Sequence, residues 1–352
     1  MAIPELLRAL LTTPGPSGYE REAARVWREA AAAFAEVTSD SLGSSVARVP
    51  GRSGGPLLAV VGHVDEIGLA VTRVRDDGLL DFRTLGGWTP ETLWGQRVEI
   101  LGRAGVVPGV VGTRHFPLPQ PGETRGRVAL RDYHLDVGAS SREEAEALVR
   151  PGDGAVLAAE PLELANDRLA SRSLDDRVGA YVALEAVRRL AEEGGAPGDV
   201  AAVAAVGEEI GDLSGARTVA YSLRPDVAVV VDVAQATDVP EGDARERGPI
   251  EVGRGPVIGR GLPLHPRVAD LLFETAEAEG IAVSTEVSAG VSNTDADAVH
   301  LSRAGIPTGL VSIPLRYIHT PNELVSLEDV EAAVRLLVAF ARRLEPGTSF
   351  VP

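Results

Sequence analysis

The spacing of apolar residues predicts two helices near the start of the chain, over residues 3–11 and 19–35. The second follows the turn PGPSG and carries a helical pattern in YEREAARVWREAAAAFAE. A continuous apolar run from Leu57 to Val61 comes next, in GPLLAVVGHVDEIGLAV. Such a run is typical of a strand that is buried on both faces of a mixed or parallel sheet.

Short alternating strands follow, from about Leu69 to Leu164, with glycine-containing turns between them. Examples are LAVTRVRDDGLLDFRTLGG and RVEILGRAGVVPGVVG, while SSREEAEALV predicts one short helix. The segment FPLPQPGETRG predicts an exposed loop. This pattern of short strands and turns indicates a small β-rich domain inserted into a larger one.

Strands and helices alternate from Ser173 onward, which is typical of an α/β sandwich. The predicted strands are VAAVAAV, DVAVVVDV, IAVSTEV and IPTGLVSI. Helices are predicted over residues 176–193 and 265–279, in DADAVHLSRAG, and in SLEDVEAAVRLLVAFARRLE at the end of the chain. Ser326 is the expected N-cap of the last helix, with Asp329 three residues on.

The composition narrows the class of protein. The length of 352 residues favours two domains, and 44% hydrophobic with 24% charged residues is ordinary for a globular protein. A net charge of −17 disfavours nucleic-acid binding. The start of the chain, MAIPELLRALLTT, lacks the pattern of a secretory signal, and no apolar stretch is long enough to span a membrane. We therefore expect a cytoplasmic protein with no membrane or nucleic-acid partner.

Ionisable residues stand where predicted strands end, and in an open α/β sheet these ends form the ligand crevice. The sequence has no cysteine, so any metal must be held by His, Asp and Glu, a donor set that suits zinc, cobalt or manganese. The candidates after strands are His63, Asp65, Glu208, Glu209, Asp232 and His319, and Asp175 and Asp176 stand before a helix.

Each candidate also has a simpler interpretation. Asp175 or Asp176 could cap the helix that follows, and His319 could be an ordinary turn residue. His63 is harder to explain in this way, because Asp65 lies two residues on and could fix the orientation of its ring. Taken together, the residues favour a metal site.

The adjacent Glu208 and Glu209 would point to opposite faces of a regular strand. Gly211 and the break at IGD indicate that the strand has ended and the backbone is turning, so both carboxylates can converge on one site. We expect structural or surface roles for the other histidines, His115, His134, His265 and His300. His115 is the most plausible exception, since its loop, residues 116–126, could reach a site.

The sequence resembles the tetrahedral (TET) aminopeptidases, the co-catalytic metallo-aminopeptidases that include glutamyl and deblocking aminopeptidases and some proteins labelled endoglucanase. The blocks that carry the resemblance occur in order over nearly the whole chain: PSGYE, GHVDEIG, LGGW, LDVGASSREEAE, LDDRVGA, EEIGDLSGA, VVDVAQATDVP and IPLRYIHTPNELVSLEDVE. It implies a mixed, mostly parallel sheet sandwiched by helices, as in zinc peptidases. Residues 1–66 and 164–352 would form the catalytic domain, and residues 67–163 a small PDZ-like β-barrel for dimerisation and assembly.

The resemblance also implies two divalent cations per subunit, zinc or alternatively cobalt or manganese. Their five ligands would be His63 and Asp232 on one cation, Glu209 and His319 on the other, and Asp175 bridging them. Glu208 would be the general base that activates a water shared by the cations, and Asp65 would support His63. Gly207 and Asn293 depart from the family pattern, which often has Gln and Gly there, and they put specificity in question.

The expected function is an aminopeptidase that hydrolyses N-terminal residues from short peptides. The resemblance implies a homo-oligomer built from dimers, with a tetrahedral dodecamer as one form. An alternative is a metal-dependent amidase or deacylase on N-acyl amino acids, with the same ligands and a different pocket. A third possibility, a non-catalytic shell or binding protein, would be marked by a lost ligand or base.

Overall fold

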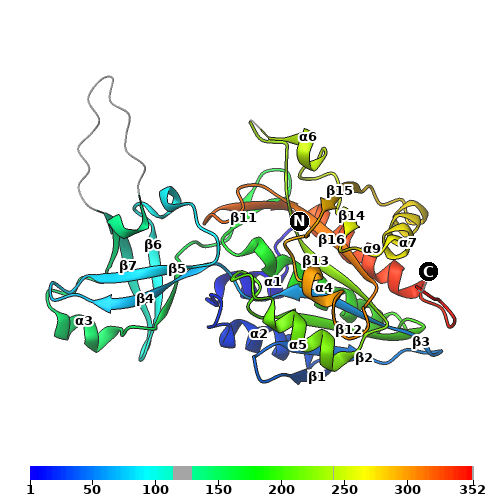
Figure 1. The fold of residues 1–352 in the computed structure, drawn as a ribbon, viewed down its shortest axis with the longest axis horizontal. Helices are drawn as coiled ribbons and strands as arrows, with labels where there is room; N and C mark the ends of the chain where they lie inside the picture. The colour runs from blue at the N-terminus through cyan, green and yellow to red at the C-terminus, as the bar shows by residue number, and fades with distance from the viewer. Residues whose placement is uncertain (114–128, 241, 351–352) are drawn as a thin grey trace.

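A computed structural model describes residues 1–113, 129–240 and 242–350. Figure 1 shows an α/β body joined to a smaller β structure at one side. The expected fold class, a helix-flanked mixed sheet with a small inserted barrel, is confirmed. His115 and the 116–126 loop lie outside the described residues.

The body is built on an eight-stranded sheet in the order β1-β2-β12-β3-β13-β16-β14-β15. Its four central strands, β12, β3, β13 and β16, run parallel, so their carboxyl ends meet at one edge. The strands are β1 (Glu36–Ser39), β2 (Ser45–Val49), β3 (Gly55–His63), β12 (Gly198–Ala205), β13 (Val227–Gln235), β14 (Val257–Leu262), β15 (Ser284–Ala289) and β16 (Thr308–Leu315).

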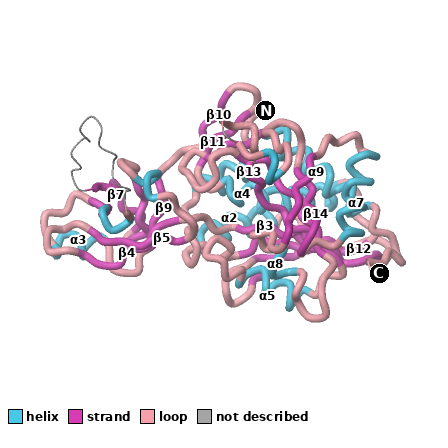
Figure 2. The backbone as a smooth tube through the Cα atoms, turned by 45° about the horizontal axis from the view of Figure 1, so that its top comes forward, coloured by secondary structure: helices cyan, strands magenta, loops and turns pink. Residues whose placement is uncertain are grey.

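Helices cover both faces of this sheet (Figures 1 and 2). Along β3, Leu58 and Val60 pack into the core of one face, and Ala59 and Val61 into the core of the other, as the apolar run predicted. The first face carries α1 (Glu5–Thr12), α2 (Arg21–Ala31), α4 (Leu174–Glu192), α7 (Pro266–Ala278) and α9 (Leu327–Arg342). The second carries α5 (Ser214–Leu223) and α8 (Ala296–Val299), and α6 (Ala244–Arg247) lies in the loop after β13.

The smaller part is a closed barrel in the order β4-β5-β8-β7-β6-β9 around its own apolar core. Ser141 caps its helix α3 by accepting a hydrogen bond from the backbone N–H of Glu144. The barrel elements are β4 (Gly68–Val74), β5 (Leu80–Leu85), η1 (Pro90–Leu93), β6 (Arg97–Gly102), β7 (Gly105–Thr113), η2 (Leu130–Asp132), β8 (Tyr133–Asp136), α3 (Arg142–Leu148) and β9 (Gly154–Leu157).

A three-stranded sheet, β10-β11-β17, connects the end of the barrel segment to the body. Its strands are β10 (Leu162–Leu164), β11 (Arg168–Ser171) and β17 (Glu323–Ser326). None of the helices in the described part of the chain combines the length and apolarity needed to cross a membrane.

Two local expectations were wrong. The helix expected through DADAVHLSRAG ends at Val299, and Arg303 and Gly305 adopt positive φ angles that a helix does not allow. Ser326 makes no side-chain cap bond. Asp329 instead accepts hydrogen bonds from the N–H groups of Gly253 and Gly255, at 2.6 and 2.7 Å, and so ties α9 to the loop before β14.

The start of α4 packs directly on the end of β3. A Cβ atom on Gly62 would lie 2.5 Å from the backbone of Gly179 and Ala180, and a Cβ on Gly179 would lie 2.3 Å from the Asp176 carboxylate. Glycine is therefore required at both positions for this close approach. The approach brings the acidic residues before α4 next to His63.

We predict that Gly62→Ala lowers the free energy of unfolding by about 1–3 kcal/mol, because its new methyl group must displace backbone of α4. Denaturation in urea, followed by tryptophan fluorescence, measures this. Gly290→Ala is the matched control, since no heavy atom lies within 4 Å of the added Cβ. An unfolding midpoint of Gly62→Ala equal to that of wild type would contradict the close approach.

Candidate metal centre

The ends of the four parallel strands position most of the candidate residues. His63 ends β3, Asp232 lies near the end of β13, and Glu208 and Glu209 follow β12. His319 comes four residues after β16. Because these strands are neighbours and parallel, their ends bring together side chains that are far apart in the sequence.

Asp175 lies between the two histidines. Its Oδ1 is 3.4 Å from Nε2 of His63, and its Oδ2 is 3.5 Å from Nε2 of His319. Asp175 precedes the regular part of α4 with non-helical φ and ψ angles. The carboxylate thus presents one oxygen to each imidazole, which is the position expected of a bridging ligand.

Glu208 and Glu209 both turn toward this site. Glu208 Oε2 lies 3.8 Å from His63 Nε2, and Glu209 Oε2 lies 3.3 Å from His319 Nε2. Gly207, with φ +70°, and Gly211, with φ +73°, bend the backbone on either side of the pair. The strand ends at Ala205, so the alternation of a strand no longer applies and the two neighbours face one space.

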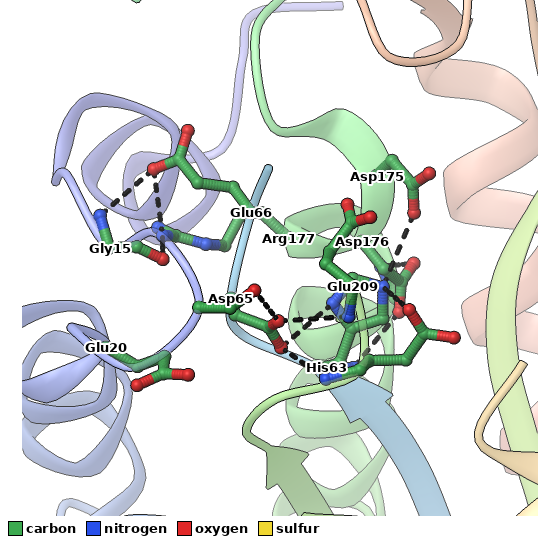
Figure 3. Close-up of polar contacts among 12 residues, drawn as sticks. Gly15, Glu20, His63, Asp65, Glu66, Asp175, Asp176, Arg177 and Glu209 are labelled. Carbon is green, nitrogen blue, oxygen red and sulfur yellow. Dashed lines mark hydrogen bonds and ion pairs between the residues drawn. The ribbon is translucent and has the colours of Figure 1, made fainter. Parts of the chain in front are cut away.

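Asp65 contacts His63 and also holds the turn that carries Glu208 and Glu209. Its Oδ1 lies 3.4 Å from Nδ1 of His63 and accepts a hydrogen bond from the N–H of Glu208 at 3.2 Å. Its Oδ2 accepts from the N–H of Glu209, also at 3.2 Å. Figure 3 shows the Asp65 carboxylate facing both His63 and Glu209.

A cavity of about 480 Å³ opens over these groups. Eight ionisable residues line it: Asp175, Glu208, Glu209, Asp232, Arg247, Glu286, Asp297 and His319. The cavity is large enough for a few amino-acid residues and is polar where the histidines and carboxylates meet.

The chain matches the family of the M42 glutamyl aminopeptidases over residues 43–336. It belongs to this family. It is 34% identical over 351 residues to the lysyl aminopeptidase of Pyrococcus furiosus, an alignment that covers 97% of each chain.

Solved structures agree with this. A TET aminopeptidase from a marine sediment archaeon of the Thaumarchaeota superimposes with a TM-score of 0.92 at 35% identity, covering 97% of this chain and 96% of that one. The Pyrococcus horikoshii TET1 peptidase, described as able to assemble into a tetrahedron or a large octahedral shell, gives a TM-score of 0.84 at 31% identity. That comparison covers 97% of this chain and 99% of the other.

Burial and mutual repulsion raise the pKa values of several acidic groups at this centre in the M42 chain, while the contacts of Asp175 with His319 and His63 outweigh its burial and lower its pKa. Burial raises the pKa of Glu208 to about 10, and the charges of Asp232 and Asp295 act in the same direction. Burial and the charge of Asp175 raise the pKa of Glu209 to about 7 and that of Asp232 well above its usual range. The centre therefore holds more buried acid than neighbouring positive charge can neutralise.

The pKa values of the two imidazoles are raised as well, because neighbouring carboxylates stabilise the protonated rings. Burial by itself lowers the pKa of His319, but its contacts with Asp175 and Glu209 outweigh burial and raise that pKa to about 11. Burial likewise opposes the contacts of His63 with Asp175 and Asp65, and its net pKa lies well above the usual range.

These residues fit divalent cations. Donor atoms of His63, Asp175 and Glu209 lie within 4.8 Å of one another, as do donor atoms of His63, Asp176 and Asp232. Oε1 of Glu209 is buried without a hydrogen-bond partner among the described residues, so a donor atom is free at the centre. Imidazole nitrogen and carboxylate oxygen suit zinc, cobalt and manganese alike.

Asp176 also accepts hydrogen bonds from two backbone N–H groups. Its Oδ1 accepts from the N–H of Gly179 at 3.0 Å, three residues on, and its Oδ2 accepts from the N–H of His63 at 3.2 Å. Asp176 is thus the residue of the acidic pair that caps α4, and it fastens this helix to the end of β3.

Sequence reasoning gave no role to Glu323. This residue is 2% exposed, and its carboxylate accepts from the N–H of His319 at 2.9 Å and from the N–H of Asp175 at 3.1 Å. It fixes the backbone of two candidate ligands at once. The only signal in the sequence was its place in the block YIHTPNE, four residues after His319.

Asp295 was also missed. It is 1% exposed, and neither of its carboxylate oxygens has a hydrogen-bond partner among the described residues. Burial raises its pKa to about 7. Nothing in the run NTDAD distinguished it from an ordinary helix-start aspartate.

The two departures from the family pattern both occupy left-handed backbone. Gly207 has φ +70°, and a Cβ there would lie 2.9 Å from Ser214 Oγ. Asn293, with φ +56°, is one of the few residue types other than glycine that visit this region readily. Local conformation accommodates both residues.

The other described histidines lie outside the candidate centre. His265 immediately precedes α7, His300 directs Nδ1 to the carbonyl of Ala296 at 2.8 Å, and His134 lies on barrel strand β8.

We predict that stripping divalent cations with a chelator lowers the melting temperature, because it restores repulsion among buried carboxylates. Resupplying zinc, cobalt or manganese at about a thousandfold excess over its Kd should raise the temperature by roughly 5 °C. Differential scanning calorimetry measures the shift, and magnesium, a poor partner for imidazole, serves as the control. Equal melting temperatures with and without cation would contradict a metal centre here.

We predict that Glu323→Gln weakens cation binding by about 10–100-fold, because an amide replaces one acceptor with a donor facing a backbone N–H. Isothermal titration of the chelator-treated protein with zinc measures this. Glu331→Gln is the control, since among the described residues Glu331 of α9 forms its ion pair with Arg189 of α4. Unchanged affinity in Glu323→Gln would show that this carboxylate does not position the ligands.

Proposed function

We propose that this protein removes N-terminal residues from short peptides, using two divalent cations and Glu208 as general base. Membership of the M42 family makes it an aminopeptidase, a hydrolase of peptide bonds. The observation that carries the finer proposal is the placement of Asp175 between His63 and His319, with Glu208 and Glu209 turned to the same space.

Five residues would hold the cations. His63 and Asp232 would hold one, Glu209 and His319 would hold the other, and Asp175 would contribute to both. The cations, when bound, supply Lewis acidity that polarises the scissile carbonyl and acidifies the attacking water. The excess of buried carboxylate described above supports this ligand set.

Glu208 moves the proton. Its side chain faces His63 and lines the cavity without being one of the five ligands. A carboxylate oxygen of Glu208 takes a proton from the water as the oxygen of that water bonds to the carbonyl carbon. Glu208 then gives this proton to the amide nitrogen as the carbon–nitrogen bond breaks, and the shortened peptide leaves with a free amine.

The carboxylates also explain a preference for free amino termini. An α-ammonium group entering the cavity would meet two acids of its wall that are not among the five ligands, Glu286 and Asp297. A substrate whose amine carries an acyl group loses this attraction. The amidase or deacylase alternative, which needs an N-acyl amino acid, is therefore disfavoured.

The non-catalytic alternative would be marked by a missing ligand or base, and every one of these residues is present. We extend the proposal to a cytoplasmic location and to a homo-oligomer built from dimers, with the tetrahedral dodecamer as one form. The tetrahedral or octahedral assembly of the Pyrococcus horikoshii relative supports the oligomer. Within it, residues 67–163 would serve assembly, and residues 1–66 and 164–352 catalysis.

We predict that Glu208→Gln lowers kcat on an aminoacyl anilide by about 10²–10⁴-fold, because the amide cannot accept the proton of the water. Stopped assays paired with metal analysis by mass spectrometry check this, and the variant should retain both cations. Asp212→Asn, an exposed acid in the same turn, is the control and should keep normal turnover. Near-normal turnover of Glu208→Gln with cations bound would remove Glu208 as the base.

We predict that aminoacyl anilides are cleaved and N-acetyl amino acids are not, because only the former offer a free amine to the acidic wall. A panel of both substrate types, run with zinc, cobalt and manganese restored in turn, measures this. Faster cleavage of the N-acetyl compounds would favour the deacylase alternative instead.

A further inference from the structure

The turn PSGYE before α2 takes no part in the mechanism described above, yet it packs against the end of β3. Ser17 donates its backbone N–H to the carbonyl of Glu66 at 3.2 Å, and the N–H of Glu66 bonds back to the carbonyl of Gly15 at 3.2 Å. Glu66 Oε1 also accepts from the N–H of Gly15 at 3.0 Å. Figure 3 shows Gly15 and Glu66 facing each other beside Asp65.

Buried arginines hold Glu66 in place. Arg177 of α4 lies 3.3 Å from Glu66 Oε1 and donates to the carbonyl of Thr13 at 3.1 Å, and Arg172 pairs with Glu66 Oε2. The turn, the end of β3 and the start of α4 therefore form one rigid unit, in which the position of Ser17 is fixed.

Ser17 is 3% exposed, and its hydroxyl donates to Asp65 Oδ2 at 2.7 Å. This is the shortest of the hydrogen bonds to Asp65, since those from the N–H groups of Glu208 and Glu209 measure 3.2 Å. Ser17 Oγ and Glu209 N bond to one carboxylate oxygen, while Glu208 N bonds to the other. Rotation of the Asp65 carboxylate would thus disturb the backbone of the general base directly.

Glu20 reinforces the same arrangement from below the turn. Its Oε1 accepts from the N–H of Gly18 at 2.7 Å, which closes the turn around Ser17. The turn therefore reaches the Glu208 loop through Ser17 and its hydrogen bond to Asp65.

We propose that Ser17 is a positioning residue for catalysis, which orients Asp65 so that Asp65 holds the backbone of Glu208 and Glu209 against His63. This inference rests on the proposed function, because it concerns the placement of the general base. Ser17 does not line the cavity, so it acts without touching substrate. A displacement of the base by even an ångström is costly to the rate of the chemical step.

The test is Ser17→Ala, in which Asp65 Oδ2 keeps only the bond from Glu209. We expect kcat to fall by about 10–100-fold, KM to change by less than about twofold and cation stoichiometry by calorimetry to stay at the wild-type value. Hydrogen–deuterium exchange of the peptide that contains Glu208 and Glu209 should become faster, a readout independent of activity. Ser17→Thr keeps the hydroxyl and should recover most of the lost kcat.

Thr275→Val is the matched control, because it removes a buried hydroxyl that, within the described part of the chain, bonds to the carbonyl of Leu271 in α7. It should leave kcat and exchange near Glu208 unchanged. Wild-type kcat in Ser17→Ala would overturn the proposal, as would equal losses in Ser17→Ala and Ser17→Thr or a loss that tracks missing cation. If Ser17→Ala does not fold, Ser17→Cys decides the matter, since it keeps the size and weakens the donor.

Failure of this inference can be told apart from failure of the proposed function. A wild-type protein that does not cleave aminoacyl anilides with any of the three cations defeats the proposed function. An active wild type with an equally active and equally protected Ser17→Ala variant defeats only the role of Ser17.

Discussion

Carboxylates crowd around two imidazoles at the carboxyl ends of β3, β12, β13 and β16, in a space that solvent barely reaches. Asp175, Glu209 and Asp232 cannot all carry charge there without positive partners, and His63 and His319 are too few to neutralise them. The parallel sheet creates this crowding, because neighbouring strands deliver their ends to one edge. Divalent cations, as proposed above, would resolve it.

The backbone around the centre is held by acids outside the five proposed ligands. Asp65 accepts from the N–H groups of Glu208 and Glu209, Glu323 from those of Asp175 and His319, and Asp176 from that of His63. Each acceptor is buried, so its bonds are protected from competition with water. These acids hold the backbone of the proposed ligands and of the proposed base in place, as efficient catalysis would require.

The amino-acid pattern was sufficient for the architecture, since the apolar runs at β3, β12 and β13 identify a buried parallel sheet and the alternating segments identify the barrel. It also pointed to the residues that follow these strands, because ionisable groups after an apolar run are conspicuous. The convergence of Glu208 and Glu209 required the turn to be inferred from Gly211. Their chemical roles came from family resemblance and stay predictions.

Contacts between segments that are far apart in the chain could not be predicted from the sequence. Ser17 bonds to Asp65 across 48 residues, and Glu323 bonds to Asp175 across 148. No periodicity encodes such pairs, since they arise from where the turns fall in three dimensions. The short α8 and the uncapped start of α9 were missed for a related reason, because tertiary contacts such as those of Asp329 replaced the expected local bonds.

The central claim is that two cations share this site through Asp175 while Glu208 stays free to move a proton. Anomalous diffraction from crystals grown with zinc or cobalt tests it most directly. We expect two peaks in each subunit, separated by roughly 3.5–4 Å, with one oxygen of Asp175 on each and Glu208 outside both coordination spheres. A single peak, or a peak coordinated by Glu208, would contradict the account.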